Sequence, residues 1–135
     1  MTVPSGLWRV WLFLAGISGA VAVGAGAYGA HGLAGKERVL VEAFRTGVLY
    51  HLVHSLALVG AAWAAERPAM GPRTVVAHVA GVAFAAGIVL FSGSLYVFGM
   101  TGIVPVAGAA PVGGTMLIVG WLALAASAVS LGAKT

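Results

Sequence analysis

Two histidines within one helical turn are the side chains best able to do chemistry in this sequence. His51 and His54 lie three residues apart, and Tyr50 and Ser55 flank them. At 100° per residue, these four side chains fall on one face of a helix, together with Gly47. An imidazole can carry a proton, ligate a metal or a haem iron, or donate and accept hydrogen bonds. The candidate polar or ligand cluster is therefore centred on this face.

Further polar residues are expected at the same depth on neighbouring helices. Ser92, Ser94 and Tyr96 lie in a later apolar segment that returns to the same side of the membrane, and His31 ends the first such segment. Polar groups in a membrane are costly unless they are paired, so these residues are functional candidates. Three interpretations stay open: hydrogen bonding between helices, a site for a quinone head group, haem or proton, and a metal site. No metal is expected, because no cysteine or carboxylate lies at that depth to complete a coordination shell.

The composition identifies the environment in which these residues work. The chain has 135 residues, of which 61% are hydrophobic and 7% charged, and its mean hydropathy is +1.05. Soluble domains carry about 25% charged residues, so lipid must surround most of this chain. The only carboxylates are Glu37, Glu42 and Glu66, and there is no cysteine. Paired-carboxylate catalysis and a Ser-His-Asp triad are therefore disfavoured, and the scattered positive charge offers no nucleic-acid surface.

The hydropathy pattern predicts a single domain over residues 1–135, with an all-α integral membrane fold. A bilayer core of about 30 Å needs roughly 20 apolar residues in a helix. Four segments meet this length, and short connections between them favour an up-down bundle of four transmembrane helices. The expected spans cover about residues 7–30, 44–65, 74–100 and 112–131.

The distribution of positive charge predicts the orientation in the membrane. Arg9, Arg67, Arg73 and Lys134 fall on one side, against Lys36, Arg38 and Arg45 on the other. The positive-inside rule then places both termini in the cytoplasm. The spacing of Arg38, Glu42 and Arg45 also predicts a chain of ion pairs along one helix.

Small residues are expected to bring the helices into close contact, because membrane helices gain little from hydrophobic burial against one another. The candidate packing glycines are Gly16, Gly24, Gly26, Gly47 and Gly87. Of the four tryptophans, three are expected to anchor the protein at the membrane interface, and one is expected only to pack against other side chains. The expected anchors are Trp8, Trp11 and Trp63, with His78 also interfacial, whereas Trp121 should only pack.

Five segments of the chain resemble one known family in order: Trp11 to Gly16, Gly29 to Leu33, Phe44 to His54, Leu90 to Tyr96, and Pro111 to Gly114. They are similar to the small membrane family called domain of unknown function 423, which includes transmembrane protein 256. The resemblance implies a protein with four membrane spans, placed in bacteria in the cytoplasmic membrane. It implies no established activity.

Taken together, these features favour a non-enzymatic helix bundle that oligomerises or associates with a larger membrane partner. No resident cofactor is expected. The alternative is a membrane module that binds a quinone, haem or proton at His51 and His54. A small transporter is the third interpretation, and it is disfavoured because the two halves of the chain show no repeat.

Overall fold

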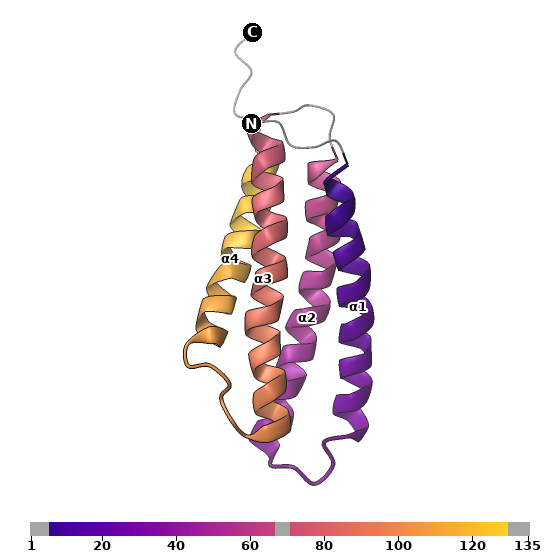
Figure 1. Cartoon of the computed structure of the whole chain (residues 1–135), viewed down its shortest axis with the longest axis vertical. Coiled ribbons are helices and arrows are strands. Elements are labelled where there is room, and N and C mark those ends of the chain that lie inside the picture. The colour runs from indigo at the N-terminus through magenta and orange to yellow at the C-terminus, as the bar shows by residue number, and fades with distance from the viewer. Residues whose placement is uncertain (1–5, 67–70, 130–135) are drawn as a thin grey trace.

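Four long helices make up the computed structural model, which describes residues 6–66 and 71–129 (Figure 1). No strand occurs in these two ranges. Each helix is long and apolar enough to cross a membrane, which confirms the predicted all-α membrane fold. The helices are α1 (Trp8–His31), α2 (Arg38–Ala65), α3 (Pro72–Thr101) and α4 (Ala109–Ala128).

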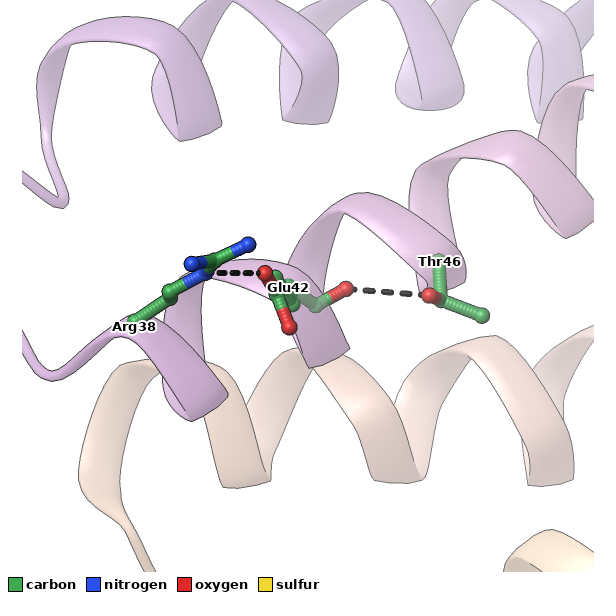
Figure 2. A network of polar contacts seen from close by, with 3 residues as sticks. All are labelled: Arg38, Glu42 and Thr46. Atoms are coloured by element: carbon green, nitrogen blue, oxygen red, sulfur yellow. Dashed lines mark hydrogen bonds and ion pairs between the residues drawn. The ribbon is translucent and has the colours of Figure 1, made fainter.

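The second helix extends beyond the apolar span expected from about residue 44. It begins at Arg38, and its first turns are helical although they carry charged side chains. Figure 2 shows these turns, where Arg38 Nε donates to Glu42 Oε1 at 2.6 Å and Thr46 Oγ1 donates to the Glu42 carbonyl at 3.0 Å. The ion pair is highly exposed, so it adds little stability. Within the described part of the chain, Arg45 does not join this pair, contrary to expectation.

A glycine and a lysine stabilise the C-terminal end of α3. Gly102 ends α3 with a left-handed φ of 73°, which glycine adopts without strain. Lys36 Nζ donates to the Met100 carbonyl at 2.7 Å, which satisfies one free carbonyl and places a positive charge at the negative end of the helix dipole. Leu131, the end of the expected fourth span, lies outside the described residues.

The helices lie side by side in chain order, with α2 and α3 in the middle and α1 and α4 at the edges (Figure 1). In the described part of the chain α1 packs mainly on α2, α4 packs mainly on α3, and α1 and α4 do not contact each other. The buried residues follow this order, since ten lie on α2 and eleven on α3, against four on each edge helix. The result is an open layer whose two edge helices face outward.

Two glycines allow the closest approach between helices, where α3 crosses α4. A Cβ placed on Gly87 would lie 2.9 Å from Leu117 Cγ and 3.1 Å from the Gly113 carbonyl. A Cβ on Gly113 would overlap the Phe91 backbone nitrogen. Gly47, on α2, lies against Tyr96 of α3, with 3.1 Å between its hypothetical Cβ and the ring.

The glycines expected to pack on α1 behave differently. A Cβ on Gly16 or Gly24 would meet no atom within 4 Å, so neither glycine mediates a helix contact within the described chain. A Cβ on Gly26 would make an ordinary contact of 3.5 Å with Val48. The row Gly16, Ala20 and Gly24 spans an arc of about 80° that points away from the buried side of α1, so the expected packing of its two glycines stays a prediction about helices outside the described chain.

Candidate functional site

His51 is the centre of a hydrogen-bonded network that joins three helices. Its Nδ1 atom lies 2.8 Å from the Tyr96 hydroxyl on α3, and its Nε2 atom lies 3.0 Å from Ser18 Oγ on α1. Ser18 Oγ in turn lies 2.7 Å from Ser55 Oγ, and Ser55 donates to the His51 carbonyl at 2.8 Å. His51 therefore fastens α2 to the helices on both sides of it.

The number of available hydrogens fixes the direction of every bond in this network. A carbonyl can only accept, so Ser55 uses its one hydrogen on His51, and Ser18 must donate to Ser55. Ser18 then has only lone pairs left for His51, which must carry its proton on Nε2. Nδ1 of the neutral ring accepts from Tyr96. The chain of donors runs from Tyr96 to the His51 backbone, so it closes on itself and does not lead out of the protein.

His54 belongs to a second, separate network. Its Nδ1–H donates to the Tyr50 carbonyl at 2.6 Å, and its Nε2 accepts from the Trp121 indole at 3.1 Å. The rings of Tyr50 and His54 also stack, with centroids 5.8 Å apart. Trp121 was expected only to pack, but its indole forms a hydrogen bond that links α4 to α2. Two neighbouring histidines thus hold opposite tautomers and bind different helices.

The remaining residues of the expected cluster fall into three groups. Ser94 donates to the Leu90 carbonyl of its own helix at 2.6 Å. His31 is exposed at the end of α1, outside both networks. Ser92 is only 1% exposed, and its Oγ is the one buried side-chain oxygen or nitrogen without a hydrogen-bond partner in the described part of the chain. The single cluster expected around His51 and His54 is therefore divided in two, with Ser92 unpaired.

A third histidine pairs with a tryptophan that the sequence had suggested as an anchor. Trp11 Nε1 donates to His78 Nδ1 at 2.6 Å, and both side chains are buried. Besides the interfacial position expected for each, the two residues therefore link α1 to α3. This pairing could have been predicted from depth in the membrane. Trp11 is near the start of α1 and His78 is near the start of α3, and these two helix starts lie at the same end of the layer (Figure 1).

Two grooves lie beside the two main histidines. The α1–α3 groove, of about 400 Å³, is lined by apolar residues of α1 and α3 and by Ser18, His51, Ser92 and Tyr96. The α2–α4 groove, of about 490 Å³, is lined by Tyr50, His54 and Trp121 among apolar side chains. The described residues contain no group of three or more metal-binding side chains. The grooves therefore suit apolar molecules better than ions.

Sequence comparisons place the chain among known proteins. Residues 25–114 match the family described as "Protein of unknown function (DUF423)". The chain belongs to this family. A DUF423-type relative, "UPF0382 membrane protein YwdK" of Bacillus subtilis (strain 168), is 42% identical over 60 residues, which cover 44% of this chain and 49% of the relative. The alignment thus spans about half of that relative's length. No solved structure matches.

Membership in the DUF423 family confirms the resemblance drawn from the sequence, and it brings no activity with it. The matched range contains His51, Ser92 and Tyr96, whereas Ser18 and Trp121 lie outside it. Part of each histidine network is therefore outside the segment that defines the DUF423 match.

Proposed function

We propose that this DUF423 protein is a non-enzymatic membrane scaffold that associates through α1 with a further copy of itself or with a larger membrane protein. The observation that carries the proposal is the outward row of Gly16, Ala20 and Gly24, which meets no other helix of the described chain. Small residues at four-residue spacing are typical of surfaces where two membrane helices approach closely. On α3 and α4, the close-packed Gly87 and Gly113 serve the same purpose within the chain.

The histidine networks support a structural role over a catalytic one. Both ring nitrogens of His51 and both of His54 are already used in bonds within the protein. A general acid or base needs a nitrogen free to reach a substrate proton. A transporter is supported less, because broken helices are typical of transporters and none of the four described helices is interrupted.

The association can be tested with the substitution Gly24→Leu. Because a Cβ there meets nothing within 4 Å, the folded chain should keep its melting temperature. The bulky side chain should however hold a second helix away from the outward row, and self-association measured by energy transfer in vesicles should fall at least tenfold.

Gly19→Leu is the matched control for this test. Its Cβ also meets nothing within 4 Å, but it lies about 100° around the helix from Ala20. Equal association of the two variants and the unaltered protein would contradict a role for this row in self-association. Loss of a co-purifying membrane protein in Gly24→Leu alone would identify the larger partner instead.

We further propose that the protein lies in the cytoplasmic membrane with both termini in the cytoplasm. Among the described residues, Arg9 and Arg73 lie at one end of the layer, and Lys36, Arg38 and Arg45 at the other. The excess at the first end depends on Arg67 and Lys134, which lie outside the described residues.

The chain has no cysteine, so a single introduced one reports its own position. Lys36→Cys should react with an impermeant maleimide added outside intact cells, whereas Arg73→Cys should react only after the membrane is opened. The reverse pattern would invert the orientation, and labelling of both from outside would contradict the four-span arrangement.

A further inference from the structure

Ser92 is unusual among the hydroxyl groups of the described helices. Thr46, Ser55, Ser94 and Thr115 each donate to the carbonyl four residues earlier in their own helix. Ser92 makes no such bond, although it is 1% exposed and lies well inside α3. A buried hydroxyl without a partner is destabilising, and natural structures contain few of them. The unused hydrogen of Ser92 therefore needs an explanation.

The α1–α3 groove supplies the space beside this hydroxyl. Ser92 lines it, next to His51 and Tyr96, and the rest of the wall is apolar. Its volume of about 400 Å³ is within the range of small-molecule sites. Gly93 also lines the groove, and a Cβ on it would meet nothing within 4 Å. The groove is therefore open next to this residue of α3.

The polar groups of the groove define which molecule would fit. The hydroxyl hydrogens of Tyr96 and Ser18 and the ring hydrogen of His51 are already used in the network, so Ser92 offers the free donor. No Lys, Arg or Glu among the described residues lines the groove, so a charged ligand would have no counter-charge. The ligand must therefore be neutral, supply a hydrogen-bond acceptor, and be apolar elsewhere.

We propose that the α1–α3 groove binds a membrane-soluble ring ketone of the quinone class, whose carbonyl oxygen accepts a hydrogen bond from Ser92. The apolar walls of α1 and α3 hold the tail, and the hydroxyl of Ser92, which is buried between the helices, must turn toward the ring to reach its carbonyl. The role of His51 in this site is to hold Tyr96 and Ser18 in place, since neither of its nitrogens is free. The site is independent of the outward row of Gly16, Ala20 and Gly24.

The first test compares two serines of the same helix. The protein in lipid nanodiscs is titrated with decyl-ubiquinone, and binding is followed by the shift of the quinone carbonyl infrared band. Ser92→Ala should weaken binding about 3- to 10-fold and abolish the shift, as expected for loss of one neutral hydrogen bond. Ser94→Ala should change neither, because the Ser94 hydroxyl bonds its own helix and does not line this groove.

The second test fills the groove. Gly93→Leu should abolish binding, whereas Gly19→Leu, whose side chain points to the opposite side of α1, should leave it unchanged. The proposal is overturned if the unaltered protein does not bind the quinone, if Ser92→Ala binds it equally well, or if decylbenzene, which has the tail without a carbonyl, binds as tightly. The last result would make the groove a lipid-tail site. Gly24→Leu should bind the quinone normally, so failure of the scaffold proposal would be seen separately.

Discussion

Gly113→Ala is expected to lower the stability of the protein strongly, because its added methyl group would meet the shortest contact of any glycine in the described chain. The added Cβ would overlap the Phe91 backbone nitrogen and lie 2.9 Å from the Leu90 carbonyl carbon. A backbone cannot rotate away as a side chain can, so α4 must move off α3. Overpacking of this kind costs about 1–3 kcal/mol, and a contact with backbone belongs at the upper end. The melting temperature in mild detergent measures the loss.

Gly114→Ala is a control that differs by one position. Its Cβ would lie 3.6 Å from the Phe91 ring, which is an ordinary contact, and alanine also favours the helix more than glycine does. We expect an unchanged or slightly raised melting temperature. Similar melting temperatures for the two variants would show that the α3–α4 crossing has room for a methyl group at Gly113.

His51→Leu is expected to be the second severe change. It keeps a side chain of similar size but removes the acceptor for the Tyr96 hydroxyl and the donor to Ser18. The Tyr96 hydroxyl on α3 would lose its partner in a setting without water, and Ser18 on α1 would keep only its bond to Ser55. At about 1–3 kcal/mol for the unsatisfied Tyr96 hydroxyl and about 1 kcal/mol for the bond lost by Ser18, the total cost is about 2–4 kcal/mol. Unfolding monitored by tryptophan fluorescence in detergent would measure it.

His51→Gln separates the loss of hydrogen bonds from the loss of the imidazole itself. An amide can accept from Tyr96 and donate to Ser18 at the same time, so most of the stability should return. If Leu and Gln gave equally stable proteins, the network would not hold the three helices together. If Gln were as damaging as Leu, the role of His51 would require the imidazole ring.

The membrane fold could be predicted because hydropathy reports directly on the solvent around each segment. The order of the helices in the layer could not, since every helix here is apolar on nearly all sides. Hydropathy therefore does not distinguish a face that contacts lipid from one that contacts protein. This is why Gly16 and Gly24 looked like packing residues in the same way as Gly87, although of these three only Gly87 lies at a helix contact within the described chain.

Part of the candidate site could also be predicted, because the position of a residue in its span gives its depth in the membrane. Matching depth on antiparallel helices relates His51 to Tyr96, and the structure shows that bond. The separation of His54 was missed because residues three apart differ by about 60° around a helix, which is enough to reach different neighbours. Its partner Trp121 comes from α4, whose position was unknown. The lack of a partner for Ser92 depends on a hydroxyl rotation that no sequence pattern encodes.

The absence of contact between α1 and α4 in the described chain has a consequence for how the protein is made. Among the helices that precede it in the chain, each helix packs mainly on the one synthesised just before it. A newly inserted helix can therefore dock as soon as it enters the bilayer, without waiting for a later segment to close a ring. Membrane proteins assemble by association of helices that are already inserted, and neighbours in sequence meet fastest. In this order of assembly, Ser18 and His51 can pair while α4 is still in the ribosome.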